Sequence, residues 1–172
     1  DRDARIRVLE MAWKANPDQI DISMPLATDY ELAGRIDEAV SVYEKVLKAN
    51  PVYDVAINNL ASLLLDPGNN KANVQRALKL AKELATSDNP ALLDTLGWAH
   101  YRSGNDREAV SVLERVVATA GQFPVFRYHL GMAYFAVGNK VAAKQELTRA
   151  VNDAEGEYPG IDEARRTLKK LD

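Results

Sequence analysis

Small and apolar side chains recur every three or four positions in two neighbouring stretches of the chain, which is the spacing of one face of an α-helix. The first stretch runs from Leu26 to Tyr30 and the second from Ala39 to Leu47. Gly34 lies between them, and a glycine between two periodic stretches is typical of a turn. The pattern therefore predicts two helices joined by a short turn, that is, a helix hairpin.

This hairpin belongs to a pattern with a fixed period of 34 residues. Residues 14–17, Lys-Ala-Asn-Pro, recur 34 positions later as residues 48–51, and Leu96-Gly97 recurs as Leu130-Gly131. A period of this length indicates an array of similar units, each of which buries its apolar face against its neighbours. Further pairs with the same offset are Gly104 and Gly138, Ala109 and Ala143, and Leu113 and Leu147.

The period predicts helices along the whole chain and no strand. Prolines stand near the start of the following helices, where the missing N–H costs no hydrogen bond, at Pro17, Pro51, Pro90 and Pro124. Small residues on the first helix of each hairpin let the second helix approach closely; they are Ala27, Ala61, Gly97 and Gly131. We expect helices at residues 3–15, 18–33, 36–49, 53–65, 73–86, 90–103, 106–119, 124–137, 140–153 and 160–171.

These residues resemble the tetratricopeptide repeat (TPR), a 34-residue helix-turn-helix unit. Matching positions are Leu26, Ala27, Tyr30, Gly34, Ala39, Tyr43 and Pro51 in one repeat, and Leu130, Gly131, Tyr134, Gly138, Ala143, Leu147 and Ala150 in another. The resemblance implies an all-α fold, a right-handed α-solenoid of TPR helix hairpins with a C-terminal capping helix. It divides a single domain, 1–172, into the second helix of a truncated repeat (1–17), four repeats (18–51, 52–89, 90–123 and 124–157) and the capping helix (158–172).

Three segments depart from the repeat. Residues 66–73 lengthen one loop, and they are either a tolerated surface insertion or a contact loop. Residues 4–15 match only the second helix of a repeat, so we expect the natural N-terminus to lie further upstream and this end to fray or self-associate. Residues 161–171 form an amphipathic helix with basic residues near its C-terminus, as the helix dipole favours, and we interpret it as a solvating cap.

A narrower resemblance concerns the C-terminal half. The segments 94–98, Asp-Thr-Leu-Gly-Trp, and 127–131, Arg-Tyr-His-Leu-Gly, together with the ending from Tyr158 to Leu168, are similar to the last repeats of bacterial TPR proteins encoded with exosortase and exopolysaccharide systems. Many proteins of that group are lipoproteins on the extracytoplasmic side. The resemblance implies a periplasmic or membrane-anchored extracytoplasmic location, and without it a cytoplasmic location is the alternative.

Composition and charge exclude several classes of protein. The 172 residues carry 22 Lys and Arg against 25 Asp and Glu, a formal net charge of −3, with no basic block. The electrostatic signature of nucleic-acid binding is therefore absent. The absence of cysteine excludes a disulfide scaffold, a cysteine nucleophile and a cysteine-ligated zinc. No run approaches the roughly 18 apolar residues that a membrane span needs.

The sequence contains no recognisable catalytic constellation. His100 and His129 are the two histidines, and neither has a second histidine at metal-ligand spacing. His100 occupies a position where the repeat places an interhelical aromatic residue, so we expect it to be a packing residue. Nucleophile elbows and phosphate-binding glycine loops are also absent. We therefore predict a protein that is not an enzyme and that uses no cofactor and no metal.

The concave surface of the solenoid is the expected binding site, because in TPR arrays the first helix of each hairpin lines the groove. Trp, Tyr and Arg are the residue types most often found as binding hot spots, and they gather in the second half of this groove. The alternative is that Trp98 and Tyr101 pack against the neighbouring repeat and are mostly buried. The resemblance maps the groove onto Met24, Thr28, Asn58, Ser62, Asp94, Trp98, Tyr101, Arg102, Tyr128, Met132 and Phe135.

These observations predict a non-catalytic scaffold that binds a protein or peptide segment in its concave groove as part of a larger protein. The groove lacks the clamp for chaperone C-termini that some TPR proteins carry, because Thr28, Ser62, Trp98 and Met132 occupy the position of its asparagine. One alternative is a structural spacer or a self-association module without a groove ligand, so homo-oligomerisation stays open. Another is an enzyme subunit whose chemistry lies outside this segment.

Overall fold

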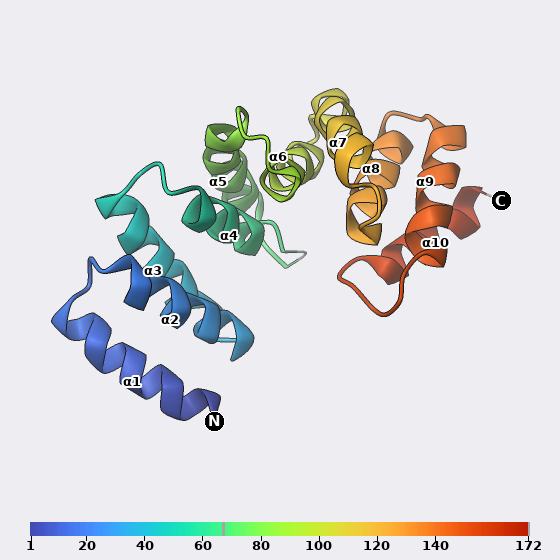
Figure 1. Ribbon diagram of the computed structural model, residues 1–172. Coiled ribbons are helices and arrows are strands. Elements are labelled where there is room, and N and C mark those ends of the chain that lie inside the picture. Colours follow the sequence, from blue (N-terminus) through green and yellow to red (C-terminus); the bar gives the residue numbers. More distant parts are fainter. Residues whose placement is uncertain (67, 172) are drawn as a thin grey trace.

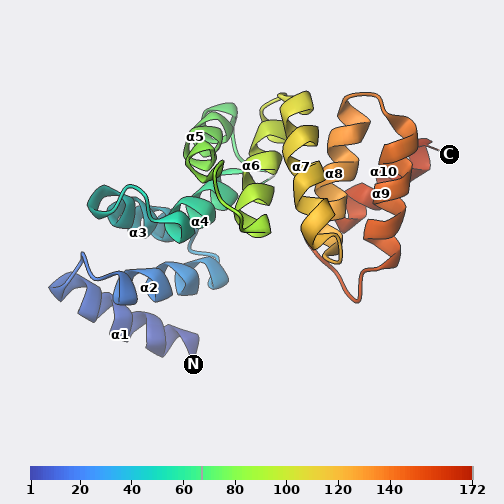
Figure 2. The ribbon, with the colours of Figure 1, turned by 45° about the horizontal axis from the view of Figure 1, so that its top comes forward.

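The computed structural model describes residues 1–66 and 68–171, and within them it consists of helices and connecting turns, with no strand. The helices follow one another in chain order along a curved array, with the two termini at opposite ends (Figures 1 and 2). Their bounds are α1 Arg2–Ala15, α2 Ile20–Leu32, α3 Ile36–Ala49, α4 Asp54–Leu64, α5 Lys71–Ala81, α6 Pro90–Arg102, α7 Asp106–Ala120, α8 Pro124–Ala136, α9 Lys140–Asn152 and α10 Ile161–Leu171. The prediction of an all-α helical repeat solenoid is confirmed.

The predicted helix ranges agree closely with the observed ones, and the largest difference lies in α5. The pattern predicts a helix over residues 73–86, whereas α5 starts at Lys71, ends at Ala81 and continues as a 3-10 turn, Lys82–Leu84. Asn70 explains the earlier start, because its side chain caps the helix by accepting a hydrogen bond from the N–H of Asn73 at 2.9 Å. The division of the chain into repeat units stays a prediction, and Pro67 and Asp172 lie outside the described residues.

Three equivalent turns join the helices of a hairpin. Gly34, Gly104 and Gly138 have φ angles of 73°, 78° and 79°, a backbone conformation that side chains with a Cβ rarely adopt. Each glycine follows the last turn of a first helix, where a left-handed residue ends the helix and redirects the chain. The recurrence of glycine at these turns, which includes the 34-residue step from Gly104 to Gly138, therefore reflects a conformational requirement.

Two of these hairpins are held together by a glycine of the first helix and a leucine of the second. A Cβ atom at Gly97 would lie 2.5 Å from Cγ of Leu113, and one at Gly131 would lie 2.6 Å from Cγ of Leu147. Both leucines are fully buried. Neither contact leaves space for a methyl group, so in the pairs α6–α7 and α8–α9 the leucine side chain of the second helix packs directly against the glycine of the first.

At the other end of the array, α1 packs on α2 through Ile6, Leu9 and Trp13. The carboxylate of Asp29 on α2, whose side chain is 1% exposed, forms an ion pair with the Arg5 guanidinium of α1. The outward side of α1 exposes Val8 and Met11. Fraying or self-association at this end stays a prediction.

We expect the cost of adding a methyl group at Gly97 to depend on Leu113. Overpacking should make Gly97→Ala destabilising by about 1–3 kcal/mol, and the cavity left by Leu113→Ala should cost about 2–5 kcal/mol. In the double variant the new methyl group occupies part of that cavity. In urea unfolding, the double variant should therefore lose less free energy of unfolding than the two single variants lose together, and the difference should be at least about 1 kcal/mol.

Gly156→Ala is the matched control for this experiment, because a Cβ at Gly156 would meet nothing within 4 Å. Its effect should add to that of Leu113→Ala. Additive effects of Gly97→Ala and Leu113→Ala would contradict the close contact described above.

Candidate functional site

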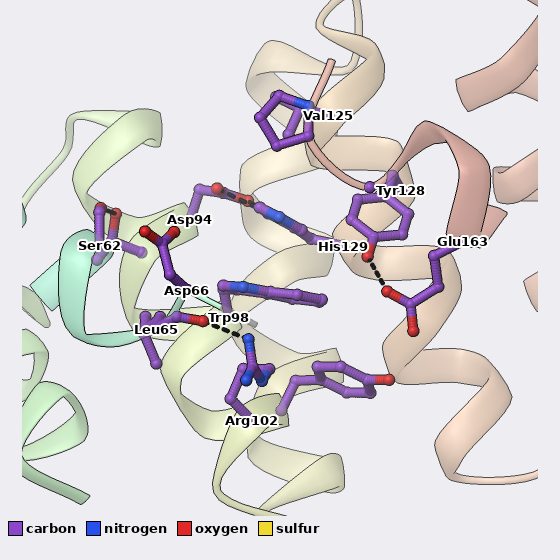
Figure 3. A pocket seen from close by; sticks show the side chains of 14 residues that line it. Ser62, Leu65, Asp66, Asp94, Trp98, Arg102, Val125, Tyr128, His129 and Glu163 are labelled. Carbon is purple, nitrogen blue, oxygen red and sulfur yellow. Dashed lines mark hydrogen bonds and ion pairs between the residues drawn. The ribbon is translucent and has the colours of Figure 1, made fainter. Parts of the chain in front are cut away.

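A cavity of about 460 Å³ opens on the concave side between α4, α6, α8 and the start of α10 (Figure 3). We call it the aromatic cavity. It combines apolar rings with carboxylates, one guanidinium and one imidazole, and it draws on residues far apart in the sequence. The lining residues are Ser62, Leu65, Asp66, Asp94, Thr95, Trp98, Tyr101, Arg102, Val125, Tyr128, His129, Pro159, Gly160 and Glu163.

The structure brings together about half of the residues that the sequence places in the groove. Those that line the aromatic cavity are Ser62, Asp94, Trp98, Tyr101, Arg102 and Tyr128. The remaining ones, which are Met24, Thr28, Asn58, Met132 and Phe135, do not line it. The predicted cluster is therefore centred on α6 and extends to α4 and α8.

Tyr128 and Met132, which the resemblance places in the groove, are both buried. The two residues are 2% and 4% exposed and belong to an apolar cluster with Leu147, Ala150 and Ala164. Ala164 lies on α10, so the helix interpreted as a cap covers side chains that the repeat pattern leaves open. Tyr128 still contributes to the cavity wall, whereas Met132 is a core residue.

Asp94 is a third residue of the predicted groove that the structure buries. Its carboxylate lies 2.9 Å, through each oxygen, from Nδ1 of His129 on α8, and the two side chains are 9% and 12% exposed. A buried carboxylate needs such a partner, because its desolvation would otherwise be costly. The pair therefore ties α6 to α8 at the cavity wall (Figure 3).

Trp98 lies between two other rings. Its ring stacks on Tyr101 at a centroid distance of 4.7 Å and on His129 at 4.1 Å, with interplanar angles of 21° and 20°. Tyr128 approaches the same indole at 5.5 Å in a tilted geometry. Trp98 is therefore half-buried and held in place from both faces. It lines the cavity, as a groove residue would, and it also packs against the neighbouring repeat, as the alternative states.

Two further polar contacts complete the wall. Arg102 donates a hydrogen bond to the carbonyl oxygen of Leu65 at the C-terminal end of α4. The hydroxyl of Tyr128 donates to Oε2 of Glu163 on α10 at 2.7 Å. Burial, followed by this hydrogen bond, raises the pKa of Tyr128. Burial and the charge of Glu163 also raise the pKa of Tyr101.

Gly160 shapes the side of the cavity formed by the start of α10. Its φ angle is 100°, and a Cβ atom there would overlap Cε1 of the Tyr128 ring. The position therefore requires glycine for two independent reasons, one conformational and one steric. The absence of a side chain lets the loop before α10 rest directly on the Tyr128 ring.

Several cavity residues are not predicted by the sequence pattern. From the sequence, His129 is considered only as a possible metal ligand and Asp66 only as part of a lengthened loop. Neither residue is therefore named as a groove residue. Gly160 and Glu163 belong to the segment interpreted as a cap, which departs from the repeat and so carries no groove positions. The signal that could have found them is the Pro159-Gly160 pair directly before a helix, because it marks a tight approach of the chain.

The first half of the concave side carries a separate polar network. Tyr43 donates a hydrogen bond to Glu31, and the amide of Asn59 donates to the Tyr43 hydroxyl at 3.0 Å. Asn58 accepts a hydrogen bond from the hydroxyl of Thr95 at 2.7 Å, which connects α4 to α6. The predicted groove residue Asn58 is thus engaged between two helices, and Thr28 is exposed beside this network.

Metal-binding and membrane-spanning features are both absent from the described part of the chain. No group of three or more His, Cys, Asp or Glu side chains there is arranged to hold a metal ion. None of its helices combines the length and the apolar character needed to cross a membrane.

Two stretches of the chain, residues 95–160 and residues 30–53, match the tetratricopeptide repeat family. Together with the helical repeat fold, these matches show that the chain belongs to the TPR family. No curated protein matches the chain in sequence.

Solved structures of TPR proteins share the fold. PilW, a type IV pilus biogenesis factor, is 16% identical with a TM-score of 0.79, and the alignment covers 99% of this chain and 78% of PilW. A thermophilic TPR protein from Thermus thermophilus is 20% identical with a TM-score of 0.69, covering 99% of this chain and 90% of that one. YrrB, described as a TPR protein with an unusual peptide-binding site, is 16% identical with a TM-score of 0.68, covering 95% of this chain and 81% of YrrB.

We expect Gly160→Ala to deform the aromatic cavity. A positive φ in a residue with a Cβ costs about 1–2 kcal/mol, and the overlap with the Tyr128 ring adds a packing penalty of about 1–3 kcal/mol. Urea unfolding should show a loss of at least about 2 kcal/mol, and near-ultraviolet circular dichroism should show changed aromatic signals. Gly156→Ala, in the same loop but in open space, should stay within about 0.5 kcal/mol of the wild type. Equal effects of the two changes would contradict this role of Gly160.

Alkaline pH should weaken the fold through its buried tyrosines. Burial and the hydrogen bond to Glu31 raise the pKa of Tyr43 to about 12, while an unfolded phenol titrates near about 10. The folded state then holds protons that the unfolded state releases, so stability is complete below about pH 10 and is lost as the pH rises toward about 12. Unfolding measured across this range should show a shallower loss for Tyr128→Phe, because the pKa of Tyr128 is also raised. If the stability of Tyr128→Phe fell with pH as steeply as that of the wild type, the raised pKa of Tyr128 would be contradicted.

Proposed function

We propose that this chain is a non-catalytic scaffold that binds a peptide or protein segment along its concave groove and anchors one side chain of that segment in the aromatic cavity. The observation that carries the proposal is the cavity itself, a space of about 460 Å³ that opens on the side of the first helices. Binding pockets for compact groups are concave, largely apolar and supplied with a few fixed polar groups, and this cavity has those properties.

The rigidity of the wall supports an anchoring role. Trp98 is held between two rings, and Asp94 and His129 fix the orientation of each other, so little side-chain freedom remains to be lost on binding. Preorganised aromatic and arginine side chains are the usual source of binding energy at interfaces. The cavity is therefore suited to a small number of strong contacts.

The family gives independent support of a coarser kind. TPR proteins are generally protein-interaction scaffolds without catalytic activity, and YrrB is described as having a peptide-binding site. At 16% sequence identity, the similarity to YrrB supports a shared fold and gives no position for a binding site in this chain. For this chain the proposed position follows from the aromatic cavity alone.

The test is to fill the cavity without disturbing the fold. Dodecapeptides selected from a random library on the immobilised chain are synthesised with a fluorophore, and their affinities are measured by anisotropy. Ser62 lies on the exposed rim, so Ser62→Trp should occlude the cavity and weaken binding at least about tenfold, or about 1.4 kcal/mol. Ser41→Trp, at an exposed position of α3, is the matched control and should leave affinity unchanged.

Leu26→Ala separates binding from folding in the same assay. Because Leu26 is buried on α2, away from the cavity, its truncation should cost about 2–5 kcal/mol of folding stability and leave the affinity of the folded molecules unchanged. Peptides whose binding is insensitive to Ser62→Trp would argue against the proposal. Concentration-dependent association in ultracentrifugation, with no peptide selected, would favour the self-association alternative instead.

A further inference from the structure

We propose that the segment bound in the aromatic cavity presents a lysine or arginine side chain to it. This inference rests on the proposed function and adds the chemistry of the anchor. It follows from the charges that line the cavity and from the bonds in which each of them is already engaged.

Carboxylates outnumber cations around the cavity. Its wall contains three of them, Asp66, Asp94 and Glu163, and a single guanidinium, that of Arg102. The imidazole of His129 is the other titratable nitrogen group. The charged side chains of the wall therefore carry a net negative charge, and the net charge of −3 for the whole chain has the same sign.

Both nitrogen groups are already engaged in bonds between helices. Arg102 donates to the carbonyl of Leu65, where its charge also meets the negative end of the α4 dipole. Nδ1 of His129 is 2.9 Å from each oxygen of Asp94. These contacts hold the wall together, and they engage one nitrogen of each group in bonds within the protein.

Two carboxylates, by contrast, retain free acceptor capacity. Glu163 uses Oε2 to accept from Tyr128, and within the described residues its Oε1 makes no hydrogen bond. The carboxylate of Asp66, on the exposed rim, interacts with the charge of Arg102 but makes no hydrogen bond with a described residue. Figure 3 shows Asp66 and Glu163 on opposite sides of Trp98. A cation that enters the cavity therefore meets acceptors on both sides.

The aromatic side chains suit the rest of a basic side chain. Both faces of Trp98 are covered, so the indole offers its edge rather than a face to a ligand. A lysine or arginine can lay its methylene stem along such apolar surface and keep its charged end at the polar rim. An aspartate or glutamate would instead bring its charge toward three carboxylates, which disfavours an acidic segment.

The experiment uses the peptides selected on the wild-type chain in the assay described above. They should share a lysine or arginine at one fixed position, and replacing it by norleucine, which keeps the stem and removes the charge, should weaken binding about tenfold. Glu163→Gln, which preserves an acceptor for Tyr128, and Asp66→Asn should each weaken binding of the basic peptide about fivefold, with no effect on the norleucine peptide. Glu155→Gln, an exposed carboxylate of the loop before α10 that does not line the cavity, should change neither.

The outcomes distinguish this inference from the proposed function. Peptides that lose affinity with Ser62→Trp but share an acidic or an uncharged residue would overturn the basic anchor and leave groove binding intact. Peptides that ignore Ser62→Trp would overturn both. Equal effects of Glu163→Gln and Asp66→Asn on the basic and norleucine peptides would also overturn the inference, because the loss would then come from the wall and not from the charge.

Discussion

The contact between a glycine on one helix and a leucine on the next is the constraint on which the groove depends. Gly97 against Leu113 and Gly131 against Leu147 leave no space between the helices of each hairpin, so the rotation of α6 and α8 about their axes is fixed. Successive residues on a helix are turned by about 100°. With Gly97 facing α7, the next residue, Trp98, is turned toward the concave side, where it meets α8.

The fold was predictable from the sequence because the features that determine it are local and recur along the chain. The apolar period fixes the helices, and the glycines at Gly34, Gly104 and Gly138 fix the turns through their positive φ angles. The main departure, the early end of α5, comes from a single 3-10 turn, which apolar periodicity does not encode. Capping by Asn70 likewise depends on one side chain and not on the pattern.

The site was harder to predict from the sequence, because only some of its residues occupy repeated positions. Asp94, Trp98 and Arg102 occupy one face of a first helix, and that face is predictable. Gly160 and Glu163 come from outside the repeat, and their approach to Tyr128 is a tertiary contact with no periodic signature. The burial of Met132 has the same origin, since α10 completes the cluster that covers it. Sequence reasoning therefore named several residues that line the cavity on α4, α6 and α8, and it named none on α10.

The length of the array that the aromatic cavity spans has a consequence for the mechanics of the molecule. In a linear array each unit contacts its neighbours, so the molecule bends mainly at the interfaces between units. The wall of the aromatic cavity runs from Ser62 on α4 to Glu163 on α10 and therefore crosses several such interfaces. A segment seated there would act as a brace across them, stiffening the stretch from α4 to α10 while α1 to α3 kept their freedom to bend.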